Sequence, residues 1–85
     1  MISDLIVESS LTKLQNGHVS GKSFRVAVRL RQDKHIPLFK NHYAKMCDHL
    51  PYYLAYMSAP AIHVRVFHCN FRHETDAIAF YLSVK

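Results

Sequence analysis

The clearest pattern in the chain is an alternation of apolar and polar residues with a period of two over residues 23–31. Apolar side chains alternate there with mostly basic ones, namely Phe24, Val26, Val28 and Leu30 against Arg25, Ala27, Arg29 and Arg31. Successive side chains of a strand point to opposite sides of a sheet. The segment therefore predicts a strand with one apolar face and one basic face.

Three further segments are predicted as strands. Residues 61–69 alternate, and we expect Val64 and Val66 to join Val26 and Val28 on the apolar face. Residues 77–84 alternate as well, with Phe80 and Leu82 on the apolar side. Residues 4–14 fit a strand less cleanly and are followed by a turn over residues 16–22, which opens on the turn-forming pair Asn-Gly.

One segment predicts an amphipathic helix, beginning at Pro37 and ending before Pro51. Its apolar positions recur at spacings of three and four: Leu38, Phe39, His42, Tyr43, Met46, Cys47 and Leu50. Proline suits the first turn of a helix and interrupts its interior. Residues 52–57 are interpreted as a further short helical turn, residues 58–60 as a connection, and residues 70–76 as a polar loop.

The predicted order is strand, strand, helix, strand, strand. The length of 85 residues suits a single domain over residues 1–85. The expected fold is α+β: a small antiparallel sheet (ββαββ) with one main helix packed on its apolar face. No apolar run approaches the ~18–20 residues that span a bilayer, and no signal-peptide pattern opens the chain, so no membrane partner is expected.

Positive charge is concentrated in one part of the chain. Eleven Lys and Arg against six Asp and Glu give a formal net charge of +5 and a pI of about 9.5. Residues 22–45 contain seven of the cations and a single acid, which is +6 for that segment. Such a concentrated positive field attracts polyanions, so the composition favours an anionic partner.

The face of the sheet opposite the helix is the candidate binding surface. Arginines pair with phosphates and aromatic rings stack on unpaired bases, so interleaved cations and rings favour single-stranded RNA over duplex DNA. The predicted RNA-binding residues combine this face with nearby lysines: Lys22, Arg25, Arg29, Arg31, Lys34, Lys40, His63, Arg65, Phe67 and Tyr81. We expect a non-enzymatic RNA-binding protein, acting as a homodimer that doubles this surface and covers open sheet edges.

Other interpretations of the same face remain open. It is also consistent with a solvated polar face, with a dimer or partner interface, or with an inhibitor that binds an acidic protein. A metal-independent ribonuclease is the enzymatic alternative, because such enzymes need a histidine or glutamate and a cation. His63 with Arg65, or His73 beside Arg72 and Glu74, supplies these groups.

Metal and cofactor chemistry is not expected from the motifs. The seven histidines and two cysteines lack the paired spacing of a structural zinc site, and no glycine-rich phosphate loop is present. We predict no metal, no cofactor and no catalytic residue. Cys47 and Cys69 are too few for a disulfide framework and are expected to be buried free thiols.

In size, basicity and compact composition, the chain resembles the small early proteins with which T-even bacteriophages antagonise RNA-bound ToxN-type endoribonuclease toxins. The resemblance implies RNA binding that holds the toxin in an inactive ribonucleoprotein, and it implies the cytoplasm of the host cell as the location. It rests on the general character of the chain and assigns no role to any particular residue.

Overall fold

A computed structural model describes residues 2–14, 24–47, 49–50 and 53–85. The strands are β1 (Ile6–Lys13), β2 (Phe24–Leu30), β3 (Tyr53–Ala61) and β4 (Val64–Phe71). The helices are α1 (Ile36–Cys47) and α2 (Glu74–Val84), with the short 3-10 turns η1 (Ile2–Leu5) and η3 (Asp33–His35). The α+β class and the antiparallel sheet are confirmed. The predicted order is not, because the segment predicted as the last strand is helix α2 and strand β3 was not predicted.

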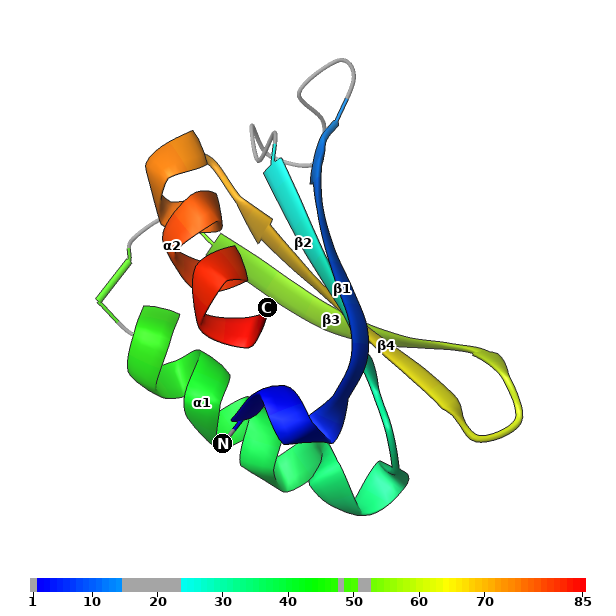
Figure 1. Cartoon of the computed structure of the whole chain (residues 1–85). Helices are drawn as coiled ribbons and strands as arrows, with labels where there is room; N and C mark the ends of the chain where they lie inside the picture. The colour runs from blue at the N-terminus through cyan, green and yellow to red at the C-terminus, as the bar shows by residue number, and fades with distance from the viewer. Residues whose placement is uncertain (1, 15–23, 48, 51–52) are drawn as a thin grey trace.

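The four strands form one antiparallel sheet in the order β1-β2-β4-β3. The central pair β2–β4 aligns Val26 with Cys69 and Val28 with Phe67. Both helices lie on the same side of the sheet, as Figure 1 shows, and no described helix covers the other side. We call this uncovered side the open face.

The core lies between the sheet and the helices and is built largely from phenylalanine rings. Phe39 of α1 packs against Phe67 of β4 with ring centroids 4.7 Å apart, and against Phe80 of α2 at 6.2 Å. Phe80 also contacts Phe71 at 5.6 Å. Because aromatic rings bury large areas and pack in tilted or edge-to-face pairs, these few residues hold two helices on a small sheet.

The prediction of a strand over residues 77–84 is wrong, because this segment is helix α2. Its buried residues Ala77, Phe80 and Val84 follow the spacing of a helix, and Glu74 and Asp76 lie in the first turn, where acids interact favourably with the helix dipole. The alternation that suggested a strand came from Ile78 and Leu82, which are exposed on the outer side of the helix.

Residues 52–57 were predicted as helix and residues 58–60 as a connection, but residues 53–61 form the edge strand β3. Strands favour aromatic residues such as those of this segment. A two-residue turn at Ile62 and His63 leads into β4. His63 takes a positive φ of 63°, a conformation that His tolerates better than most non-glycine residues. The hairpin projects beyond the ends of β1 and β2 (Figure 1).

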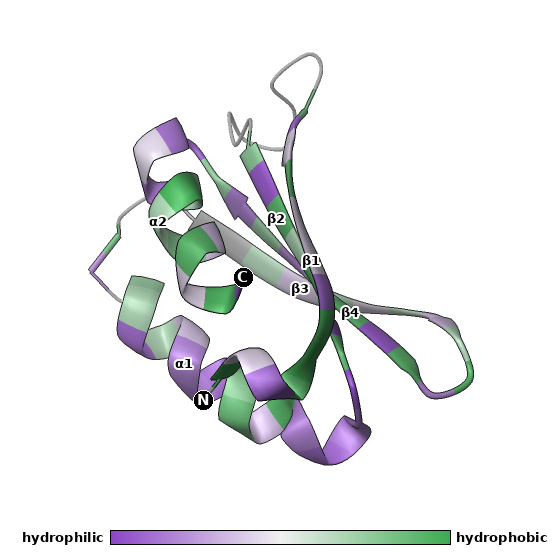
Figure 2. Ribbon diagram, in the orientation of Figure 1, coloured by the Kyte–Doolittle hydropathy of each residue, from purple (hydrophilic) through white to green (hydrophobic). Residues whose placement is uncertain are grey.

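The predicted helix over residues 37–50 corresponds to α1, which ends earlier, at Cys47. The predicted strands over residues 4–14 and 23–31 correspond to β1 and β2, except that residues 4–5 belong to η1. Along β2, hydrophobic and hydrophilic residues alternate as expected (Figure 2). The predicted strand over residues 61–69 corresponds to β4 and to the last residue of β3. The predicted turn over residues 16–22 lies outside the described residues.

Candidate nucleic-acid interface

The open face is built by residues of all four strands that alternate with those of the core. In register across the sheet, Arg25 lies beside Asn70, and Ala27 lies between Ser10 and His68. On β3, Tyr56 is the neighbour of His68. The face therefore joins two arginines of β2, Arg25 and Arg29, to polar and aromatic side chains of β3 and β4.

Arg25 is the centre of a hydrogen-bond network on this face. Its Nε donates to the Asn70 side-chain oxygen at 2.9 Å, and its Nη2 donates to the Tyr56 hydroxyl at 3.1 Å. The guanidinium also lies 6.0 Å from the centre of the Tyr56 ring. These contacts bring three strands together through one half-buried side chain and fix the direction of the guanidinium.

Tyr56 and His68 form a stacked pair beside this network. Their ring centroids are 4.9 Å apart with an interplanar angle of 21°, and Tyr56 remains 43% exposed. His68 Nε2 and the Ser58 hydroxyl share a hydrogen bond of 2.9 Å. Burial lowers the pKa of His68, and the nearby Arg25 lowers it further. At neutral pH the pair is thus an uncharged, partly exposed aromatic platform with a cation at its side.

Two buried polar atoms of this region, one on Asn70 and one on His68, have no hydrogen-bond partner among the described residues. Asn70 is fully buried, and its side-chain nitrogen is unpaired while its oxygen accepts from Arg25. His68 Nδ1 is buried and unpaired as well.

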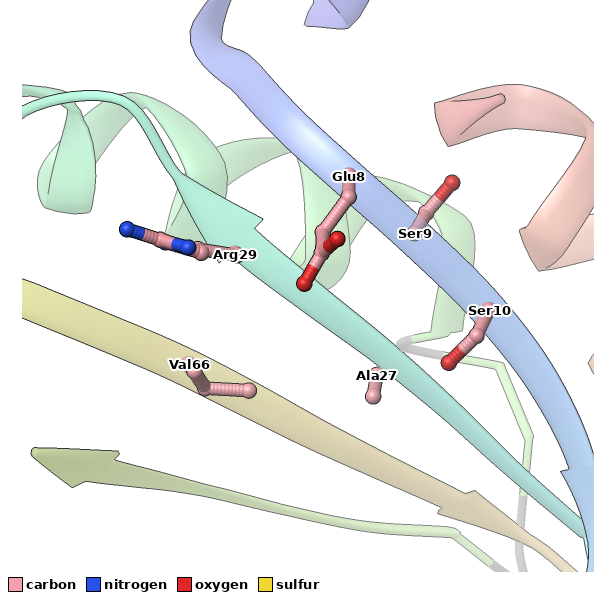
Figure 3. A pocket seen from close by; sticks show the side chains of 6 residues that line it. All are labelled: Glu8, Ser9, Ser10, Ala27, Arg29 and Val66. Carbon is pink, nitrogen blue, oxygen red and sulfur yellow. The ribbon is translucent and has the colours of Figure 1, made fainter. Parts of the chain in front are cut away.

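A hollow of about 180 Å³ continues the open face toward β1. Its lining residues are Glu8, Ser9, Ser10, Ala27, Arg29 and Val66 (Figure 3). The small side chain of Ala27 leaves space between Ser10 and Val66. The Glu8 carboxylate extends over β2 beside Arg29 (Figure 3) and reduces the positive charge at this end of the face.

Several of the residues predicted for this face lie elsewhere. Phe67 is buried in the core against Phe39, and Tyr81 belongs to α2, where Lys85 lies over its ring at 5.8 Å. Arg65 shares the core side of β4 and forms a 3.5 Å ion pair with Asp33. Both sides of β4 carry apolar residues, so alternation alone could not decide which side faces the helices.

Val64 and Val66 were expected in the core and instead share the open side of β4 with His68 and Asn70. His63 was predicted on the open face and lies in the exposed β3–β4 turn.

The remaining predicted cations are divided between two regions. Arg31 follows β2, where its Nε donates to the Asp4 backbone oxygen at 3.4 Å. Lys34 and Lys40 are exposed on η3 and α1, in the helical layer. Lys22 lies outside the described residues. Of the predicted set, the structure brings Arg25 and Arg29 together on the open face and separates them from Lys40.

Four residues of the site were missed: Tyr56, Ser58, His68 and Asn70. Tyr56 and Ser58 were missed because β3 was not predicted, and His68 because β4 was assigned the opposite orientation. Asn70 was missed because residues 70–76 were predicted as a loop, whereas β4 extends to Phe71. The aromatic content of residues 52–56 was a usable strand signal, since aromatic residues favour pleated, half-buried surfaces.

The two alternative groups considered for ribonuclease chemistry lie at opposite ends of β4. His63 lies in the hairpin turn, and Arg65 is paired with Asp33. His73 is the residue before the first turn of α2, on the opposite end of β4 from His63. Within the described parts of the chain, no group of three or more His, Cys, Asp or Glu side chains is arranged to hold a metal ion.

The two cysteines are buried free thiols, as predicted. Burial raises the pKa of Cys47 to about 12, and the pKa of Cys69 is raised by burial as well. Both are therefore thiols rather than reactive thiolates at neutral pH.

The fold and the open face define a small α+β domain with an uncovered sheet face that carries arginines and a stacked aromatic pair. Comparison with family models, with curated proteins and with solved structures gives no match. No helix formed by the described residues is long and apolar enough to cross a membrane.

Proposed function

We propose that this protein binds single-stranded RNA on the open face without cleaving it. The observation that carries the proposal is the exposed Tyr56–His68 stack with Arg25 fixed at its side. An exposed ring accepts an unpaired base by stacking, and a fixed guanidinium beside it binds the adjoining phosphate. Arg29 extends the cationic path along β2.

The shape of the face favours a single strand. An uncovered sheet face gives splayed bases room to lie on its rings, whereas duplex DNA is bound mainly by elements that enter a groove. The low pKa of His68 supports the same function, because a neutral imidazole leaves the stack free of charge and concentrates positive charge on the arginines.

The first experiment measures binding of a fluorescent single-stranded RNA and of duplex DNA over a salt series, followed by analysis of the RNA for cleavage. We expect intact RNA, weaker binding to DNA, and an affinity that falls steeply as salt rises because counterions are released from the phosphates. No RNA binding at low salt would exclude the proposed function. Cleavage that disappears in His63→Ala or His73→Ala would instead support a ribonuclease.

A matched pair of variants locates the surface. Arg29→Glu reverses one charge on the open face, and Lys40→Glu makes the same change on α1. Loss of a charge-assisted phosphate contact worth about 1.5–3 kcal/mol should weaken RNA binding by about tenfold or more in Arg29→Glu. Lys40→Glu should weaken it much less. The reverse result would keep RNA binding and move it to the helical side.

Antagonism of a ToxN-type toxin is a narrower form of this proposal. It predicts that a complex with the RNA-bound toxin forms and is lost when the RNA is digested, because the RNA forms the bridge. An inhibitor that binds an acidic protein directly predicts a complex that survives nuclease treatment. The same pull-down, with and without nuclease, separates the two.

A further inference from the structure

The two outer strands of the sheet differ in how well they are protected. The order β1-β2-β4-β3 leaves β1 and β3 as edges, and an edge strand presents unpaired backbone groups to solvent. Proteins usually protect such edges with charged side chains, proline, bulges or a covering segment. β1 carries the charged residues Glu8 and Lys13, both exposed.

β3 is the longest strand of the sheet and contains none of the charged residues of the chain. Its sequence is YLAYMSAPA, and Figure 2 shows pale to green colours along it, without the deep purple of charged residues. Tyr56 and Met57, near its middle, are each 43% exposed. Pro60 and the register shift between Ser58 and Ala61 protect only the end next to the turn.

We propose that β3 pairs antiparallel with β3 of a second copy of this chain, joining two four-stranded sheets into one continuous sheet. Antiparallel pairing of a strand with its own copy is self-complementary, as a two-fold interface requires. Charge favours this edge too. Each chain carries +5, so two copies approach with least repulsion along a strand that has no charge.

The dimer would place the two open faces on the same side of the continuous sheet. Tyr56 lies near the middle of β3, so the two Tyr56–His68 stacks would flank the two-fold axis and the charged β1 strands would lie at the far ends. A single RNA strand would then be able to contact the Tyr56–His68 stacks of both copies. The pairing itself depends only on β3 and does not rest on RNA binding.

The test is the mass of nuclease-treated protein, measured by sedimentation equilibrium. We expect twice the 9.9 kDa of one chain for the wild type. Met57→Lys and the double variant Met57→Lys, Ala59→Lys add charge to the exposed edge and should give one chain mass, with unchanged circular dichroism. The matched control Thr12→Lys adds a charge to the exposed side of β1 and should remain dimeric.

Amide hydrogen exchange on the unmodified protein provides a second measurement that does not depend on variants. Alternate β3 amides point away from β4. In the dimer they should exchange slowly at high protein concentration, and on dilution, when the dimer dissociates, they should exchange fast. A wild type with the mass of one chain and fast exchange at these amides would overturn the proposal. Dissociation by Thr12→Lys with no effect of the β3 variants would place the interface at β1 instead.

Discussion

The two sides of β2 and β4 use the same strands for different purposes. On the helix side, Val26, Val28, Phe67 and Cys69 are buried and close against rings of α1 and α2. On the open side, the intervening positions carry arginines, a histidine and a fully buried asparagine whose side-chain nitrogen has no hydrogen-bond partner among the described residues. The helix side is closed by apolar packing, whereas the open side keeps polar and partly exposed groups.

The two sides also differ in what holds them together. Burial of apolar surface stabilises the helix side without regard to direction, whereas the open side depends on hydrogen bonds with defined geometry around Arg25. A substitution on the first side should therefore change the free energy of unfolding, and one on the second should change ligand binding more than it changes folding. Each experiment below tests this difference.

The largest effect is expected for Phe67→Ala on the helix side. Phe67 is 5% exposed and packs on Phe39, so its removal leaves a cavity and should lower the free energy of unfolding by about 3–5 kcal/mol. Val66→Ala, one residue earlier on the open side, should cost about 1 kcal/mol. Urea denaturation of both variants measures the difference, and equal losses would mean that the two sides are not distinguished as described.

A smaller loss of stability is expected within the open side itself. Arg25→Ala removes the donor to the buried Asn70 oxygen, which should lower the free energy of unfolding by about 1–3 kcal/mol. Arg29→Ala, for which no described hydrogen bond is lost, should change it by less than about 0.5 kcal/mol. If both variants unfold at the wild-type denaturant concentration, the Arg25 network does not stabilise the sheet.

The contrast between the sides explains which elements could be predicted from the sequence. β2 has apolar residues on one side only, so its alternation predicted both the strand and its orientation. β4 has Val64 and Val66 on one side and Phe67 and Phe71 on the other, so its strand character was predicted but its orientation was not. Shifting a strand by one residue exchanges its two faces, so His68 was assigned to the wrong face, while Asn70 lay beyond the predicted end of the strand.

The error at residues 77–84 has a related cause. Ala77, Phe80 and Val84 carry the helical spacing, but exposed Ile78 and Leu82 fill in an alternation of equal strength. The other missed element is β3. It could not be predicted locally because its strand is defined by long-range pairing with β4. Arg25 and Arg29 were placed on the correct face of the sheet because β2 was the one strand with both period and orientation encoded locally.

RNA affinity should respond to Tyr56 more than stability does. Tyr56→Ala removes the exposed ring and should weaken single-stranded RNA binding by about 1–3 kcal/mol, roughly 5- to 150-fold. Tyr56→Phe keeps the ring and loses only the hydroxyl that accepts from Arg25, so most of the affinity should remain. Fluorescence anisotropy measures both. Equal loss in the two variants would mean that the hydroxyl, and not stacking, supports binding.

The smallest effect is expected for the pH dependence of stability, to which one histidine on each side of the sheet contributes. Burial lowers the pKa of His42 on the helix side and of His68 on the open side, with Lys45 and Arg25 respectively adding to it. Below the ordinary histidine pKa of about 6.5, the unfolded chain binds protons that the folded chain does not. The stability that the two neutral histidines contribute is therefore fully present above about pH 6.5. It is lost as the pH falls through their lower pKa values in the folded state.

Glutamine substitutions separate the two histidines. His42 Nε2 donates to the Ser83 hydroxyl at 3.0 Å, since Ser83 donates its own hydrogen to the Phe80 carbonyl. His42→Gln and His68→Gln should each flatten part of the stability profile below pH 6.5, measured by urea denaturation. Only His68 lies in the proposed interface, so only His68→Gln should also change how RNA affinity varies over that range. An equal effect of His42→Gln on RNA affinity would show that the two sides of the sheet are coupled.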